Sequence, residues 1–215
     1  MGYERFSPVE RRLTIAGIAV SVWRPPDMEA LIDLAAFEAD ERIPYWADVW
    51  ESAIVLAEEI AGMDAGGRTF LELGCGLGLP SLVARRVGFR ATATDYEETA
   101  LEGVRYAAAR NGIADLATRV VDWRCPPEDL GTFDLVVAAD VLYESHHPAA
   151  LAATIQRTLA PAGTALVADP CRAKAAGFPA AARAAGLAVT KTAARRPHGA
   201  TDGPKVEIHR VTWPA

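Results

Sequence analysis

The sequence predicts an α/β protein with a Rossmann-like, doubly wound and mostly parallel sheet, and two observations lead to this prediction. From residue 69 onward, short apolar runs alternate with helical stretches, which is typical of repeated βαβ units. Near the end, GLAVTKTA and KVEIHRVTW have no helical pattern between them and predict a C-terminal antiparallel hairpin. We therefore expect one main domain over residues 46–215, preceded by an extension over residues 1–45.

The extension is expected to contain a hairpin and a helix. Residues 13–23 are rich in β-branched side chains and break at an Ala-Gly pair, which predicts a short hairpin. A helix is expected over residues 27–39. Asp48 and Glu51 stand at the spacing of a capping box, so the next helix is expected to start at Asp48.

The core strands and helices follow from the alternating pattern. Strands are expected at residues 69–73, 90–94, 117–121, 133–138 and 164–168. Proline and acidic residues suit a first helical turn, and glycine or asparagine suits a helix end. Helices are therefore expected from Pro80 to Gly88, from Glu97 to Asn111 and from Pro148 to Gly163.

Composition and charge limit the partners and the compartment. The net charge of −6 disfavours a protein that binds by neutralising phosphates, so nucleic acid is not an expected partner. Three cysteines without metal-ligand spacing indicate reduced thiols and no structural metal. There is no apolar run long enough for a signal peptide or a membrane span. We expect a cytoplasmic protein that does not bind membranes.

The stretch FLELGCGLGLPSL predicts a ligand site where a strand meets a helix. Glu72 lies near the strand end, and Gly74, Gly76 and Gly78 follow it, so bare backbone is expected to approach a ligand at the carboxyl edge of the sheet. A dinucleotide fingerprint would need glycine where Leu79 stands, and a Gly-Lys-Ser/Thr phosphate loop is missing too. The alternative is a tight turn that only packs the strand on the helix.

Two further positions support a nucleoside ligand. Asp95 ends the next expected strand, 19 residues after Gly76, and a carboxylate at that distance can accept hydrogen bonds from both ribose hydroxyls. Asp122 and Trp123 follow the third strand and offer a carboxylate and an indole for a purine. The alternatives are a helix cap for Asp95 and a core aromatic role for Trp123.

The motifs ELGCGLG, TDYEE, VDW and FDLVVAADVLYE, in this order and spacing, resemble the class I S-adenosylmethionine-dependent methyltransferases with a seven-stranded sheet. More narrowly, DVWESAIVLAEEI and DVLY are similar to the protein lysine methyltransferases of the methyltransferase-16 group. The resemblance covers residues 45–170. It implies S-adenosylmethionine as the cofactor.

The resemblance also implies roles for individual residues. It places Glu72, Gly74, Cys75 and Gly76 at the methionine part of the cofactor, Asp95 at the ribose, Trp123 with Asp122 at the adenine, and Trp50 and Ala139 beside the cofactor. Asp140 and Tyr143 match the D-x-x-Y motif at the mouth of the methyl-donor site, which makes them the candidate catalytic residues.

The chemistry at the mouth would require an amine to be captured and desolvated. A carboxylate stabilises an ammonium, so Asp140 is expected to aim the amine rather than to deprotonate it directly. Tyr143, with Tyr45 and Trp46, is expected to form an aromatic wall that attracts and shields the cation. The alternatives are a loop cap for Asp140 and a packed ring for Tyr143. His146 and His147 are expected to be a solvated loop pair outside the site.

Three functions are compatible with these motifs. The expected one is a protein methyltransferase that acts on lysine side chains of a cytosolic protein. The alternatives are a small-molecule N- or O-methyltransferase and a catalytically silent module that only binds the cofactor.

Overall fold

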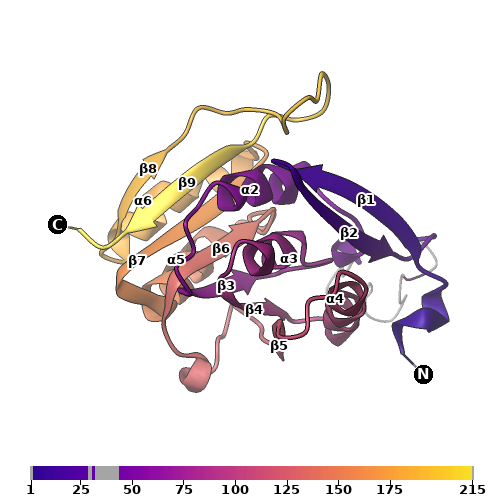
Figure 1. The fold of residues 1–215 in the computed structure, drawn as a ribbon. Coiled ribbons are helices and arrows are strands. Elements are labelled where there is room, and N and C mark those ends of the chain that lie inside the picture. Colours follow the sequence, from indigo (N-terminus) through magenta and orange to yellow (C-terminus); the bar gives the residue numbers. More distant parts are fainter. Residues whose placement is uncertain (1, 29–30, 32–43, 215) are drawn as a thin grey trace.

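The fold is known from a computed structural model, which describes residues 2–28, 31 and 44–214. A seven-stranded sheet forms the centre, with the strand order β5-β4-β3-β6-β7-β9-β8 (Figure 1). The first five of these strands run parallel, and β9 is antiparallel to both β7 and β8. The strands are β5 (Ala117–Val120), β4 (Arg90–Asp95), β3 (Thr69–Leu73), β6 (Phe133–Ala139), β7 (Leu159–Asp169), β9 (Glu207–Thr212) and β8 (Ala188–Lys191). The predicted fold class and C-terminal hairpin are confirmed.

Helices cover both faces of the sheet, and each face buries its own apolar cluster. On one face lie α2 (Glu51–Ala61), α3 (Leu79–Arg86) and α4 (Glu98–Arg110), and on the other lie α5 (His147–Thr158) and α6 (Phe178–Ala184). Alternate residues of β3 explain the division, because Phe70 packs in the first cluster and Leu71 in the second. None of the described helices has both the length and the apolar character to cross a membrane.

A separate two-stranded hairpin covers α3 and α4. It consists of β1 (Val9–Ile15) and β2 (Ile18–Arg24), which pair antiparallel around a tight turn at Ala16 and Gly17 (Figure 1). The Asn111 side chain anchors it to the end of α4, because its amide donates to the Ser21 carbonyl (2.7 Å) and its oxygen accepts from the Ser21 N–H (3.0 Å). The predicted hairpin is confirmed, and the helix expected over residues 27–39 lies almost wholly outside the described residues.

Two predicted boundaries are wrong. The helix expected at Asp48 begins at Glu51 instead, and the Asp48 side chain accepts from the N–H of Val49 rather than forming a capping box. The helix expected to reach Gly163 ends at Thr158, because β7 begins immediately afterwards and pairs with β6 across a register shift. The short helix α6 is not among the predicted elements.

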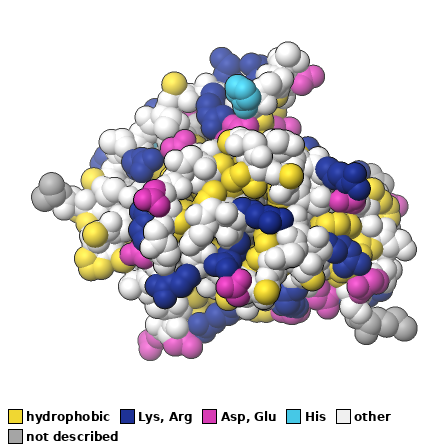
Figure 2. All heavy atoms as spheres, viewed as in Figure 1, with side chains coloured by type: hydrophobic (Ala, Val, Ile, Leu, Met, Phe, Trp, Pro, Cys, Tyr) yellow, Lys and Arg dark blue, Asp and Glu magenta, His cyan; other side chains and the backbone are white. Residues whose placement is uncertain are grey.

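Charged side chains are mixed on the surface of the helical face that carries α2, α3 and α4. Figure 2 shows lysine and arginine side chains spread among acidic and hydrophobic ones over the described part of this face. Several arginines are in ion pairs, such as Arg85 with Asp115 and Arg105 with Glu98 (both 2.5 Å). The basic side chains in this view do not gather into one patch.

Candidate active site

A cleft opens at the carboxyl ends of β3, β4 and β6, where an open parallel sheet commonly binds ligands. Every predicted site residue except Asp122 lines this cleft. The predicted residues at its wall are Trp50, Glu72, Gly74, Cys75, Gly76, Asp95, Trp123, Ala139, Asp140 and Tyr143. Tyr45 and Trp46 of the entry segment line it too, as the expected aromatic wall requires.

Three glycines shape the floor of the cleft. Gly74, Gly76 and Gly78 have φ values of 66°, 51° and 72°, a region that side chains disfavour. A Cβ on Gly74 would lie 2.9 Å from Val141 Cγ1, and one on Gly78 would lie 2.7 Å from Val104 Cγ2. The loop therefore exposes backbone to the cleft and also packs the strand on the helix, so tight packing of this turn does not exclude a ligand site.

Glu72 is a buried carboxyl group next to this loop. Its Oε2 accepts hydrogen bonds from the backbone N–H (3.0 Å) and hydroxyl (2.5 Å) of Ser81, near the N-terminus of α3. Burial raises the pKa of Glu72 to about 8, although the Ser81 hydrogen bonds oppose the shift. The group is therefore mostly protonated at pH 7, and a positively charged ligand in the cleft would favour its ionised form.

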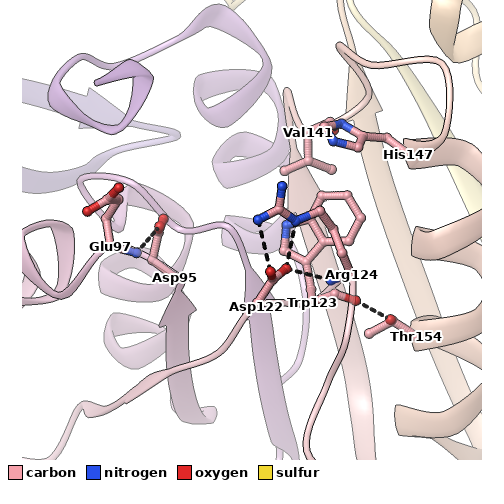
Figure 3. A network of polar contacts seen from close by, with 8 residues as sticks. All are labelled: Asp95, Glu97, Asp122, Trp123, Arg124, Val141, His147 and Thr154. Atoms are coloured by element: carbon pink, nitrogen blue, oxygen red, sulfur yellow. Dashed lines mark hydrogen bonds and ion pairs between the residues drawn. The ribbon is translucent and has the colours of Figure 1, made fainter. Parts of the chain in front are cut away.

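Asp95 connects the end of β4 to the glycine loop. Its Oδ2 accepts from the Gly76 N–H (2.9 Å), and its Oδ1 accepts from the Glu97 N–H (3.0 Å), the contact drawn in Figure 3. Asp95 therefore accepts the hydrogen bond expected of a helix cap and also lines the cleft. Each carboxylate oxygen has a second lone pair, which leaves acceptor capacity for a ligand hydroxyl. Burial raises the pKa of Asp95 to about 6.

Trp123 is buried in the cleft wall, whereas its neighbour Asp122 is not among the residues that line the cleft. The indole Nε1 would lie 3.4 Å from a Cβ on Gly74, and the Trp123 carbonyl accepts from the Thr154 hydroxyl (2.5 Å). Asp122 pairs with Arg124 (2.8 Å), as Figure 3 shows. Burial tends to raise the pKa of Asp122, but the hydrogen bonds and the positive charge of Arg124 outweigh it, so the pKa is lowered.

His147 is not the solvated loop residue expected from the sequence. It begins α5, is 2 % exposed, and its ring packs edge-on against Trp123 (5.1 Å between centroids) and Tyr143 (4.7 Å). Its Nδ1 lies 2.7 Å from the Val141 carbonyl oxygen (Figure 3), and burial lowers its pKa. His146 is exposed as expected. Pro148 indicated the start of the helix, because proline suits a first helical turn, but it gave no sign that His147 is buried.

The mouth of the cleft combines a carboxylate with tyrosine rings. Asp140 has a φ of 63°, and its N–H donates to the Ala168 carbonyl (2.9 Å). The rings of Tyr143 and Tyr45 lie 5.5 Å apart between centroids. Burial raises the pKa of Tyr143, so its hydroxyl stays protonated at neutral pH. The predicted catalytic pair and the aromatic wall therefore share one wall of the cleft.

Two further residues at the mouth are absent from the sequence predictions. Arg172 forms an ion pair with Asp140, and Asp169, at the end of β7, accepts the backbone N–H of Arg172 (2.7 Å). The signal that could have found them is the tetrapeptide Asp-Pro-Cys-Arg directly after an expected strand, because carboxyl ends of parallel strands share one edge of the sheet.

The carboxyl groups at the cleft wall are not accompanied by a basic side chain among the described lining residues. They belong to Asp48, Glu72, Asp95 and Asp140. The described part of the chain also contains no group of three or more His, Cys, Asp or Glu that could hold a metal ion. The wall therefore favours a cationic ligand.

Comparison with known families agrees with this geometry. A family model described as a methyltransferase domain matches residues 34–197, most of the chain. The chain belongs to the methyltransferase domain family. The residues fit the cofactor S-adenosylmethionine, because a loop of bare backbone, a buried indole and an acidic wall suit an adenosyl group that carries a sulfonium and an ammonium. The expected cofactor is thereby confirmed for this methyltransferase.

Curated relatives include lysine methyltransferases, and they match about half of this methyltransferase chain. It is 31% identical to the protein N-lysine methyltransferase METTL21A of Xenopus tropicalis (45% of this chain, 47% of the relative) and 34% identical to the mouse protein-lysine methyltransferase METTL21E (48% and 47%). It is 32% identical to the ubiquinone biosynthesis O-methyltransferase of a Caulobacter strain (49% and 44%). The chain spans about half the length of these relatives.

A solved structure shares the fold of this methyltransferase. The glycopeptide N-methyltransferase MtfA in complex with S-adenosylmethionine aligns with a TM-score of 0.62 at 14% identity, over 79% of this chain and 96% of that one. At this identity the likeness shows the fold alone.

Proposed function

We propose that this protein transfers a methyl group from S-adenosylmethionine to the side chain of a lysine in another protein. The observation that carries the proposal is the set of groups at the cleft mouth, where Asp140 lines the same wall as the Tyr45 and Tyr143 rings. A carboxylate and aromatic faces both attract an ammonium, the form of lysine at neutral pH. The similarity to lysine methyltransferases supports the same acceptor.

The chain's own residues would do three things for the reaction. Asp140 would hold and aim the acceptor amine, Tyr45 and Tyr143 would shield it from water, and the glycine loop with Glu72 and Asp95 would hold the donor. S-adenosylmethionine, when bound, supplies an activated methyl group on a sulfonium. A neutral acceptor amine that is aimed by Asp140 and shielded by Tyr45 and Tyr143 would be placed to take this methyl group.

The acceptor must lose a proton before it can attack. At pH 7 the neutral form of a lysine with the reference pKa lies about 4.6 kcal/mol above the ammonium. Asp140 stabilises the ammonium and so cannot supply this energy by its charge. Removal of water from the bound amine by the surrounding rings would lower its pKa and supply part of this energy, with the proton released to water along the Asp140 side of the mouth.

The alternative acceptor is a small molecule, and the similarity to a ubiquinone biosynthesis O-methyltransferase supports this alternative. A methyl-transfer assay separates the two. Tritiated S-adenosylmethionine is added to a cell lysate with the wild-type protein, with Asp140→Ala, or with Asp129→Ala, which removes an exposed carboxylate paired with Arg119. A catalytically silent module would label nothing.

The expected result is a labelled protein band that yields methyllysine on hydrolysis. Asp140→Ala should reduce the label at least tenfold, about 1.4 kcal/mol of lost transition-state stabilisation, while Asp129→Ala should leave it within twofold. Label confined to the small-molecule fraction would overturn the lysine proposal. Equal label from the Asp140 and Asp129 variants would remove Asp140 from the mechanism.

A further inference from the structure

Arg172 lies between two carboxylates at the mouth of the cleft. Its guanidinium forms an ion pair with Asp140, and its Nη1 lies 3.7 Å from Asp169 Oδ2. Asp140 directly follows β6, and Asp169 ends β7, the neighbouring parallel strand. The sheet itself therefore brings the two carboxylates close to one guanidinium, and both face its Nη1.

This group of three side chains, Asp140, Asp169 and Arg172, is one positive charge short. The Asp169 side chain is 1 % exposed and that of Asp140 is 9 % exposed, so water contributes little to neutralising them. Among the described residues, Arg172 is the cation that forms ion pairs with either carboxylate. A second cation would complete the charge balance, and an acceptor ammonium would supply it.

The contacts within the group suit an exchange of partners. Asp140 Oδ1, Asp169 Oδ2 and Arg172 Nη1 are buried, yet none of them has a well-directed hydrogen bond in the structure. The Arg172 backbone is fixed, because its N–H donates to Asp169 Oδ1 (2.7 Å). The guanidinium can therefore shift toward Asp169 while its backbone stays in place.

We propose that Arg172 is a positioning residue that holds the Asp140 carboxylate before the acceptor binds, and then yields it to a single ammonium group by moving to Asp169. The proposal deepens the proposed function and rests on it in one respect, that the acceptor is an amine. After the exchange each carboxylate has one cation. A neutral hydroxyl acceptor would leave Asp140 with Arg172 and would not be selected.

The geometry of Asp140 explains why it needs a partner in the empty state. Its φ of 63° lies in the left-handed region, which aspartate adopts more readily than most residues but at some cost in backbone energy. The Ala168 carbonyl holds its N–H, and Arg172 holds its carboxylate. Without Arg172, we expect the carboxylate to remain available to cations but to be poorly aimed.

Binding of a lysine side-chain analogue tests the exchange. The probe is n-butylammonium chloride, titrated by NMR into the protein saturated with S-adenosylhomocysteine, with n-butanol as the neutral counterpart. Arg172→Ala should tighten butylammonium binding at least threefold, because the competing cation is gone. Asp169→Asn should weaken it at least fivefold, because Arg172 then stays on Asp140.

Lys174→Ala is the matched control for this titration. Lys174 is an exposed cation two residues from Arg172, and it pairs with Glu144 (3.1 Å) outside the group of three. Its removal should leave butylammonium binding unchanged. The proposal is overturned if Arg172→Ala weakens binding or leaves it unchanged, if Asp169→Asn behaves as Lys174→Ala does, or if butanol binds as tightly as butylammonium.

Kinetics on the labelled protein acceptor give a second readout. Arg172→Ala should lower kcat at least tenfold, and Arg172→Lys should recover part of it, whereas Asp169→Asn should mainly raise KM for the acceptor. Melting temperatures identify variants that fail to fold, and Arg172→Gln then replaces Arg172→Ala. A wild-type protein that labels no protein but shows the expected butylammonium shifts would overturn only the protein-lysine acceptor. Labelling without those shifts would overturn only the exchange.

Discussion

The half of the cleft that we assign to the cofactor is held by carboxylates that accept backbone N–H groups, whereas the side chains in the half that we assign to the acceptor are held by an ion pair and ring contacts. In the first half, Asp95 accepts a hydrogen bond from the Gly76 N–H, and Glu72 accepts one from the Ser81 N–H. In the second half, Asp140 forms an ion pair with Arg172, and the Tyr143 ring packs on the Tyr45 ring. Backbone contacts fix one geometry, while side-chain pairs can change partners.

The two halves also differ in how the chain builds them. Glu72, Gly76 and Asp95 lie within one strand-helix-strand unit, so short-range spacing decides their geometry. Tyr45, Asp140 and Arg172 come from three separate segments that meet only at the sheet edge. A donor common to a whole family suits the first design, and an acceptor that differs between family members suits the second.

The largest effect is expected where an atom is added to the rigid half. A Cβ on Gly76 would lie 3.2 Å from the Trp46 carbonyl oxygen, at a φ of 51°, and it would stand on the cleft floor. Gly76→Ala should therefore weaken S-adenosylmethionine binding about a hundredfold, or roughly 3 kcal/mol. Isothermal titration calorimetry measures this.

Gly112→Ala separates backbone strain from the loss of the cleft floor. Gly112 has a φ of 68°, and a Cβ there would meet nothing within 4 Å. This variant should lose about 1 kcal/mol of folding stability and keep its dissociation constant within twofold. Equal losses of affinity in both variants would show that strain alone, not the floor of the cleft, explains the effect at Gly76.

The next effect is a pH dependence of stability that comes from Glu72. Its pKa is about 8 in the folded chain and near 4.5 when unfolded, so the folded state keeps a proton that the unfolded state loses. Stability should fall as the pH rises through this window and level off above pH 8. Glu72→Gln should remove a slope of roughly 1 kcal/mol per pH unit.

Urea unfolding at pH 6, 7 and 8 measures this slope without cofactor. Asp95, with a pKa of about 6, also lowers the free energy of unfolding as the pH rises, but at lower pH. This loss is the same in the wild type and in Glu72→Gln. The difference between wild type and Glu72→Gln above pH 6 therefore belongs to Glu72. Parallel stability curves over that range would contradict the raised pKa.

The sequence could predict which residues meet in the half of the cleft assigned to the cofactor, because they stand at fixed distances along one unit. The glycine spacing and Asp95 indicated a ligand site at one edge of the sheet, and the family resemblance supplied the identity of the cofactor. The acceptor half was predicted only in part. Asp140 and Tyr143 came from a motif, but Arg172 reaches Asp140 across two strands, and local spacing does not show such a pairing.

His147 shows the same limit in a single residue. Its partners Trp123 and Tyr143 lie on different segments, and their rings enclose it only after the sheet and α5 have packed together. The sequence beside it, two histidines before a proline, resembles a solvated loop as much as a helix start. Burial by distant segments is the information that a local pattern lacks.

The smallest effect is expected at Asp122, which lines neither half of the cleft. The resemblance pairs it with Trp123 at the adenine, but the structure places Trp123 in the cleft wall and Asp122 in an exposed pair with Arg124. Exposed pairs contribute less than about 1 kcal/mol. Asp122→Asn should therefore change the dissociation constant for S-adenosylmethionine less than twofold, whereas Trp123→Ala should weaken binding more than tenfold. Calorimetry on both variants decides this, and a large loss in Asp122→Asn would mean that the carboxylate leaves Arg124 and turns into the cleft when the cofactor binds.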